Sequence, residues 1–130
     1  MNLLLDTHVL LWWMRDPGRL SGEARTAVAE PSNRVWFSAV SAWEIVIKAG
    51  LGRLEGPSPD AWAEILRAEV TRSRFLVLPV TIEHTLAVGS LPTPHNDPFD
   101  RLLIAQALIE NLQLVTRDAR MAAYPVSVLW

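Results

Sequence analysis

Cysteine is absent from the 130-residue sequence. Without it the protein cannot use a disulfide framework, a thiolate nucleophile or a cysteine-based zinc site. A signal peptide is not expected, because only three leucines separate Asn2 from Asp6 and no basic region precedes them. No apolar run is long enough to cross a membrane. These absences favour a protein that works in the reducing cytoplasm, away from the membrane.

Lysine is nearly absent as well, since Lys48 is the only one and the other eleven of the 12 basic residues are arginines. The formal net charge of −2 argues at first against a nucleic-acid partner. If four of the 14 acidic residues occupy one metal site, however, ten remain against 12 basic residues and the rest of the surface is close to neutral. Arginine suits phosphate recognition because its planar fork bonds two oxygens, although a codon bias explains the same excess.

Short apolar segments alternate with helical patterns along the chain. The expected strands are Asn2–Leu5, Val35–Phe37, Phe75–Leu78, Leu112–Val115 and Val126–Leu129. The expected helices cover residues 8–14, Ser21–Ala29, Ala39–Ala49, Pro59–Arg72, Thr81–Leu91 and Asp97–Asn111. This alternation indicates an α/β fold with a mostly parallel sheet. We therefore expect a single three-layer α/β/α domain over residues 1–130, with a central parallel sheet of four or five strands.

Local signals mark several of the helix ends. Ser21 precedes an alanine-rich helix as a good N-cap. Ser58 and Pro59 supply an N-cap followed by proline at the first helical position. Gly50 is a typical C-terminal signal for the helix that begins near Ala39.

The helix after the first strand is apolar on nearly every side. Residues 8–14 contain one histidine and six apolar residues, and such a helix is either buried all round or meets a partner. The six tryptophans of the chain cannot all lie deep in one core, and tryptophan is frequent in binding hot spots. We expect a partner-binding groove at Leu11, Trp12 and Trp43, although core packing accounts for some of the tryptophans.

Two aspartates closely follow predicted strands. Asp6 comes after the first strand, and Asp118 ends the segment Val115–Asp118 after the fourth. In parallel α/β sheets, ligands bind outside the carboxyl ends of the strands, so both side chains fall where a site would form. Each aspartate could instead cap the helix that comes next, and taken alone the two interpretations are equally good.

Glu44 lies inside the most apolar helix of the chain, between a tryptophan and an isoleucine. A carboxylate there is either turned to solvent or held near the core for a purpose. Two structural roles compete with a functional one: a capping box with Ser41 and an ion pair with Lys48 four residues later. We favour Ser38 as the cap, because a helix that started at Ser41 would leave two apolar helix formers outside it.

Asp97 and Asp100 stand at the start of the last long helix. Asp97 precedes Pro98, which is typical of an N-cap with proline at the first helical position. Asp100 heads the apolar stripe that continues one turn later at Leu103 and Ile104, so its carboxylate should point inward. The helix dipole favours negative charge there, but burial next to the core is costly. A bound metal ion would offset that cost.

Four acidic residues therefore come from four separate segments of the chain: Asp6, Glu44, Asp100 and Asp118. Hard cations such as Mg²⁺ take oxygen ligands of this kind. Such an ion can activate a water molecule and stabilise charge on a phosphoryl group. The three histidines are scattered without zinc-ligand spacing, and we expect no role for them in the site.

Four segments resemble those of a known family: Leu4–His8, Ser38–Ile45, Asp97–Ala107 and Thr116–Asp118. One of them alone would be a weak signal, whereas four in this order, in a chain of this length, are specific. The resemblance covers essentially the whole chain. The sequence resembles the PIN-domain family and, within it, the VapC-like ribonuclease toxins of bacterial toxin–antitoxin pairs.

The resemblance implies a metal-dependent endoribonuclease that hydrolyses RNA phosphodiester bonds with Mg²⁺ or Mn²⁺. It implies a catalytic, metal-binding set of acidic residues: Asp6, Glu44, Asp100 and Asp118. Thr7 and Thr116 would support this set, and Asp97 would lie at its rim. The implied partner is a small antitoxin, and the implied assembly is a homodimer that could bury the same tryptophans.

Other α/β classes fit the motifs less well. A haloacid-dehalogenase-like phosphatase needs a second aspartate two residues after Asp6, where this chain has His8. A receiver domain needs an aspartate after the third strand, which here is followed by Pro79 and Val80. A nucleotide-binding fold needs a glycine-rich turn or a Walker motif, and Gly50 instead ends a helix. The remaining alternative is a PIN-like module that binds RNA or a protein without cutting.

Overall fold

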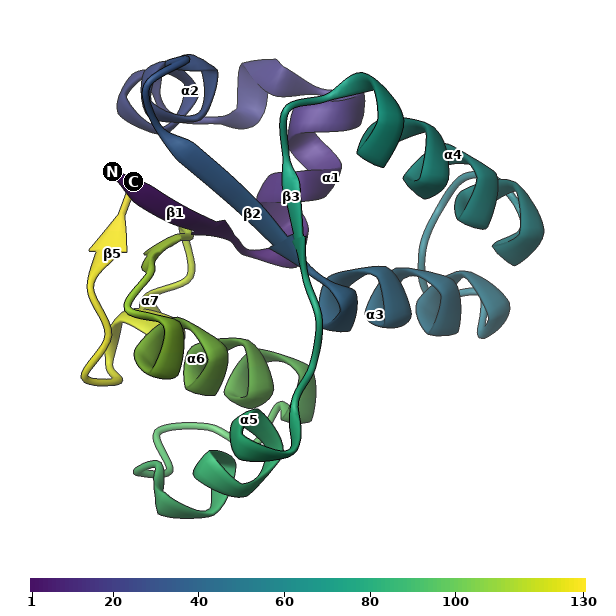
Figure 1. Ribbon diagram of the computed structural model, residues 1–130. Coiled ribbons are helices and arrows are strands. Elements are labelled where there is room, and N and C mark those ends of the chain that lie inside the picture. Colours follow the sequence, from purple (N-terminus) through teal and green to yellow (C-terminus); the bar gives the residue numbers. More distant parts are fainter.

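The structure is a computed structural model that describes residues 1–130. Five parallel strands form one sheet in the order β3-β2-β1-β4-β5 (Figure 1). Their bounds are β1 Asn2–Leu5, β2 Arg34–Ser38, β3 Leu76–Leu78, β4 Gln113–Val115 and β5 Val128–Leu129. Leu5 at the end of β1 is level with Phe37 of β2 and Val115 of β4. The central strands therefore end together, at one edge of the sheet.

Seven α-helices and two short 3-10 helices connect and cover the strands. The α-helices are α1 Thr7–Arg15, α2 Gly22–Ala29, α3 Ala39–Gly50, α4 Pro59–Arg72, α5 Ile82–Ala87, α6 Pro98–Glu110 and α7 Ala119–Ala122. The 3-10 helices are η1 Pro17–Arg19 and η2 Val88–Ser90. None of the helices combines the length and the hydropathy that a membrane crossing requires.

The two faces of the sheet carry separate hydrophobic cores, because side chains alternate along each strand. Leu3 and Leu5 of β1 belong to a core with residues of α1, α2, α3 and α4. Leu4 points to the opposite face, where it packs with residues of α6 and α7. Figure 1 shows the same division, with α1, α2 and α4 on one side of the sheet and α5 and α6 on the other. This is the expected three-layer α/β/α fold, with five strands.

Most helices begin where the side-chain caps predict. Ser21, Ser38 and Ser58 each accept a hydrogen bond from a backbone N–H at the start of the helix that follows. Asp97 accepts two such bonds, from the backbone of residues 99 and 100. The choice of Ser38 over Ser41 as the cap of α3 is confirmed, so a capping role for Glu44 is excluded.

Some element ends differ from the sequence-based expectation. Gly50 is still part of α3, and it is Gly52, with φ of 69°, that has the left-handed conformation after the helix end. The predicted helix Thr81–Leu91 is broken, because α5 ends at Ala87 and the chain continues as η2. The four-residue helix α7 was not predicted, since it is too short to show a helical period. The last strand begins at Val128 instead of Val126.

Candidate active site

Asp6 is held at the carboxyl end of β1 by the neighbouring strand β4. Its backbone N–H donates to the carbonyl oxygen of Val115 at 3.0 Å. The hydroxyl of Thr116 donates to its Oδ2 at 2.8 Å. The Asp6 side chain is buried and makes no capping hydrogen bond to α1. Of the two interpretations of Asp6, the side-chain cap is therefore excluded, and its carboxylate is oriented by Thr116.

Glu44 is buried on α3, with one carboxylate oxygen unpaired. Its side chain is only 4% exposed, and Oε2 forms the i,i+4 ion pair with Lys48 that the sequence predicts. Its Oε1 is buried without any hydrogen-bond partner. Leaving such an acceptor unsatisfied costs on the order of 1–3 kcal/mol. The fold therefore leaves one buried acceptor oxygen of Glu44 without a partner.

Thr7 connects α1 to the helix that carries Glu44. Its Oγ1 donates to Oγ of Ser41 at 2.9 Å, and both side chains are buried. Ser41 lies three residues before Glu44, on the same side of α3. The Thr7 hydroxyl donates to Ser41 and not to one of the acidic residues. Thr7 therefore contributes by fixing how closely α1 and α3 approach each other.

Asp100 is placed at the start of α6 by the Asp97 cap. The carboxylate of Asp97 accepts two hydrogen bonds from the helix backbone, so its N-cap role is confirmed. The Asp100 side chain is 13% exposed, and its Oδ2 lies 3.0 Å from Nε2 of His95. Because α6 leads back to the start of β4, its own start lies at the carboxyl edge of the sheet, where Asp6 lies.

His95 is a functional candidate that the sequence analysis missed, because it treated the three histidines as scattered. The loop before α6 folds back so that the His95 ring contacts Asp100 on one side and the Tyr124 hydroxyl on the other, at 2.8 Å. The only available signal was its position two residues before Asp97, in the segment that carries the acids. Spacing alone does not reveal the path of such a loop.

Asp118 differs from the other three acids because it is paired and partly exposed. It caps α7 by accepting from the backbone N–H of Arg120 at 2.8 Å. The Arg120 guanidinium also bonds both of its carboxylate oxygens, at 3.2 and 2.8 Å. These bonds to Arg120 lower the pKa of the Asp118 carboxyl. Asp118 therefore already has a structural role, as its sequence context allowed.

Burial raises the pKa of two of the carboxyls. It is the main reason why the pKa of Asp6 rises from its ordinary 3.8 to about 6; the hydrogen bond from Thr116 opposes this rise, and the charges of Asp100 and Glu44 add to it. Burial also raises the pKa of Asp100, against the hydrogen bond from His95 and together with the charges of Asp97 and Glu44. Asp6, Glu44 and Asp100 are therefore close enough to repel one another.

The four acids do not line one common hollow. Asp6 and Asp118 line a hollow of about 240 Å³, and neither Glu44 nor Asp100 reaches it. No three acidic or histidine side chains of the chain have an arrangement that could hold a metal ion as they stand. Two of the four carboxylates are paired with cationic side chains instead, Glu44 with Lys48 and Asp118 with Arg120.

The residues expected to form a partner groove are not in one hollow either. Leu11 is only 8% exposed and belongs to the core, although it also lines a hollow of about 360 Å³ together with Trp12. Trp12 lines the hollow beside Asp6, whereas Trp43, 54% exposed, lines another of about 330 Å³ between α3 and α4. Of the six tryptophans, Trp62 alone is fully buried. The apolar surface is therefore split between two places.

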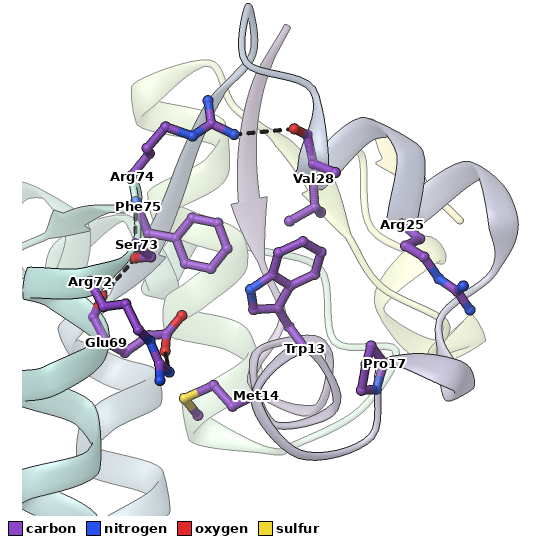
Figure 2. A pocket seen from close by; sticks show the side chains of 11 residues that line it. Trp13, Met14, Pro17, Arg25, Val28, Glu69, Arg72, Ser73, Arg74 and Phe75 are labelled. Carbon is purple, nitrogen blue, oxygen red and sulfur yellow. Dashed lines mark hydrogen bonds and ion pairs between the residues drawn. The ribbon is translucent and has the colours of Figure 1, made fainter.

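A hollow of about 590 Å³ is lined by Trp13 and Met14 near the C-terminal end of α1 (Figure 2), whereas Asp6 precedes the start of that helix. Trp13 and Phe75 pack against each other there, with ring centroids 5.7 Å apart. Its one acidic residue, Glu69, is buried and already paired with Arg72. Because this hollow holds no second carboxylate, we place the candidate site at the carboxyl edge of the sheet.

Comparison with known proteins shows the family of the chain. Residues 3–126 match the PIN domain family. The chain is 33% identical over 132 aligned positions to "Ribonuclease VapC22" from Mycobacterium tuberculosis (strain ATCC 25618 / H37Rv), and the match covers 98% of each protein.

Solved structures share the fold at low sequence identity. VapBC2 from Rickettsia felis, bound to a DNA fragment from its promoter, matches with a TM-score of 0.72 and 17% identity over 99% of this chain and 98% of that one. VapBC-1 from nontypeable Haemophilus influenzae matches with a TM-score of 0.67 and 17% identity over 99% and 97% of the two chains. FitAcB from Neisseria gonorrhoeae matches with a TM-score of 0.64 and 21% identity over 98% of this chain and 96% of that one.

Proposed function

Because the chain belongs to the PIN-domain family, we propose that it is a metal-dependent endoribonuclease that acts as the toxin of a toxin–antitoxin pair. The name of its ribonuclease relative supports RNA as the substrate. The observation that carries the metal-dependent part is buried Glu44, which keeps one carboxylate oxygen without a partner and whose charge, with that of Asp100, adds to the raised pKa of Asp6. A cation bound between these carboxylates would offset the repulsion among them.

The donor atoms are of the type that a hard divalent cation prefers, and the carboxylates would have to move closer together to hold one. All the free donors are carboxylate oxygens, which Mg²⁺ and Mn²⁺ prefer. Asp6, Glu44 and Asp100 would hold the ion, and Asp118 would join them once it is released from Arg120. When bound, the ion would supply a nucleophilic water and stabilise negative charge on the scissile phosphate.

The remaining side chains orient the acids for this task. Thr116 donates to one oxygen of Asp6 and leaves the other available. Asp97 caps α6 and so fixes the direction in which Asp100 leaves the helix. The hydrogen bond from Thr7 to Ser41 holds α1 against α3, which keeps Asp6 and Glu44 at one edge of the sheet. Together these contacts reduce the reorganisation that catalysis requires.

A small antitoxin is the proposed partner, because the structural relatives are named as VapBC and FitAcB. The exposed ring of Trp43 lies in an apolar hollow, with Phe99 packed edge-on at 5.1 Å. Nine of the ten residues around this hollow are apolar. An amphipathic segment of the antitoxin could place its apolar anchors there.

Cleavage of labelled cellular RNA by the purified protein tests the proposal. We expect endonucleolytic products with Mg²⁺ or Mn²⁺, none in EDTA, and none from Asp6→Asn or Asp100→Asn proteins whose circular dichroism matches that of the wild type. Exposed Glu64, which pairs with Arg67 on α4, offers a control, and Glu64→Gln should cleave normally. Undiminished cleavage in EDTA would exclude the metal mechanism. RNA binding without cleavage under any condition would favour the alternative, a PIN-like binding module.

A further inference from the structure

Two arginines flank the indole ring of Trp12. The guanidinium carbon of Arg19 lies 4.9 Å from the ring centroid, and that of Arg117 lies 5.8 Å from it. Both arginines are exposed, and neither forms an ion pair. Cation–π contacts of this kind hold a guanidinium in place without using its N–H donors.

The two arginines come from distant parts of the chain and meet only in the folded protein. Arg19 ends η1, and Arg117 follows β4. Trp12 lies between them on α1, and its own ring is supported by Trp130 and His8, with centroids 6.0 and 5.9 Å away. The tertiary structure therefore builds a rigid aromatic support for two like charges.

Other arginines of the chain use their guanidinium N–H donors for hydrogen bonds within the fold. Arg120 bonds both oxygens of Asp118, and Arg101 donates to two backbone carbonyls and a tyrosine hydroxyl. Arg19 and Arg117, in contrast, make no side-chain hydrogen bond, although Asp6 and Asp118 line the same hollow. The N–H donors of both guanidiniums are therefore unpaired beside this hollow and are available for an anion.

We propose that Arg19 and Arg117 form a clamp for backbone phosphates of single-stranded RNA, with Trp12 as the residue that positions both. This inference rests on the proposed function, since it takes RNA as the substrate. The clamp opens on the hollow that contains Asp6, so a strand held by it passes directly beside the carboxylates. Each guanidinium can bond two oxygens of one phosphate. Two adjacent clamp residues suit a ligand with repeated anionic groups.

RNA binding without metal tests the clamp separately from cleavage. The probe is a short fluorescein-labelled single-stranded RNA, followed by anisotropy in EDTA at several NaCl concentrations. Each phosphate contact with a single strand contributes about 0.7 to the slope of log Kd against log salt, so Arg19→Gln/Arg117→Gln should lower the slope by about 1.4. At about 0.1 M salt this corresponds to a Kd weaker by about 25-fold.

The matched control removes the same charge elsewhere. Arg25 lines the hollow of Figure 2 and Arg34 begins β2, at the opposite edge of the sheet from Asp6, and neither forms an ion pair. The Arg25→Gln/Arg34→Gln protein should keep the wild-type slope. If both double variants lower the slope equally, net charge explains the effect and the clamp is wrong.

The role of Trp12 requires its own pair of variants. Trp12→Phe keeps an aromatic face under the arginines and should retain the wild-type salt slope, whereas Trp12→Leu should lower it toward that of the double arginine variant. If Trp12→Leu does not fold, the decision rests on Trp12→Phe and the arginine variants. Equal slopes for a folded Trp12→Leu protein and the wild type would remove Trp12 from the proposal.

The clamp and the proposed function can fail independently. A chain that binds RNA through Arg19 and Arg117 but never cuts it supports the clamp and refutes the ribonuclease. If the wild type cuts RNA and the double arginine variant binds RNA as tightly as the wild type does, only the clamp is refuted. Polyglutamate of similar length serves as a second probe, and a loss of affinity for it without any change for RNA would assign the arginines to an acidic protein partner, against the proposal.

Discussion

The His95 ring connects Asp100 to Tyr124: its Nε2 lies 3.0 Å from Oδ2 of Asp100, and its Nδ1 lies 2.8 Å from the tyrosine hydroxyl. The imidazole is nearly buried and packs edge-on against the Tyr124 ring. The tyrosine hydroxyl also accepts from Arg101 and donates to the His95 carbonyl oxygen. His95 therefore has one orientation, and it holds the carboxylate of Asp100 in one orientation too.

His95→Ala should release Asp100 and weaken Mn²⁺ binding by about 10- to 100-fold, the usual effect of losing a group that orients a metal ligand. His95→Gln should recover part of the loss, because its amide can still donate to Asp100. Mn²⁺ affinity measured by electron paramagnetic resonance, beside a melting curve, separates orientation from stability. Tyr124→Phe keeps the ring contact and should have a smaller effect. Equal Mn²⁺ affinity in wild type and His95→Ala would show that the contact is structural only.

Asp6→Asn should stabilise the metal-free protein at neutral pH. The folded protein raises the pKa of Asp6 to about 6, so its ionisation opposes folding: the penalty is absent below about pH 4 and complete above about pH 6. A shift of this size corresponds to about 3 kcal/mol. Urea denaturation in EDTA at pH 4 and pH 7.5 measures it, and the gain should appear only at the higher pH.

Asp118→Asn is a control for that experiment, because it should change the stability of the protein in the opposite direction. Hydrogen bonds from Arg120 lower the pKa of Asp118, so the contribution of this pair to stability is present at neutral pH and is lost as the pH falls below the ordinary carboxyl range. The variant should be slightly less stable than the wild type at pH 7.5, because the pair is partly exposed. Stabilisation by both variants would indicate a general effect of removing negative charge.

Lys48→Met should make the protein more dependent on metal. Lys48 neutralises one oxygen of buried Glu44, and without it the carboxylate loses a partner at a cost on the order of 1–3 kcal/mol. We expect a lower melting temperature in EDTA and a larger rise on adding Mn²⁺ than in the wild type, since the cation binds the folded state. Arg67→Met removes an exposed pair with Glu64 and should change neither value appreciably. A Mn²⁺ response no larger in Lys48→Met would argue against Glu44 as a ligand.

Trp43→Ser should weaken binding of the proposed antitoxin without unfolding the protein. The ring is 54% exposed, so little core packing is lost, whereas a tryptophan hot spot contributes 2 kcal/mol or more, or about 30-fold in Kd. Calorimetric titration with the purified antitoxin measures the change. Ile82 is 68% exposed on α5, on the other side of the sheet, and Ile82→Ser is the control. If both variants bind the antitoxin with similar affinity, Trp43 is not part of the interface.

The sequence alone determined the features that depend on neighbours within one or two turns. The Ser38, Ser58 and Asp97 caps, the proline at the start of α4 and the apolar strand before Asp6 are local signals. Their backbone geometry follows from side chains a few residues away. The alternation of strands and helices then led to the three-layer fold and to the edge of the sheet where Asp6 lies.

Only the tertiary structure decided how side chains distant in the sequence meet. It buried Leu11 but left Trp43 exposed, paired Asp118 with Arg120, and brought His95 against Asp100. These outcomes depend on loop paths and on competition among partners for each carboxylate. The spacing of residues in the sequence predicts neither the loop paths nor the outcome of this competition. The physical reason is that a cap or a helical stripe is satisfied within its own segment, whereas burial and charge pairing are settled by the whole packed chain.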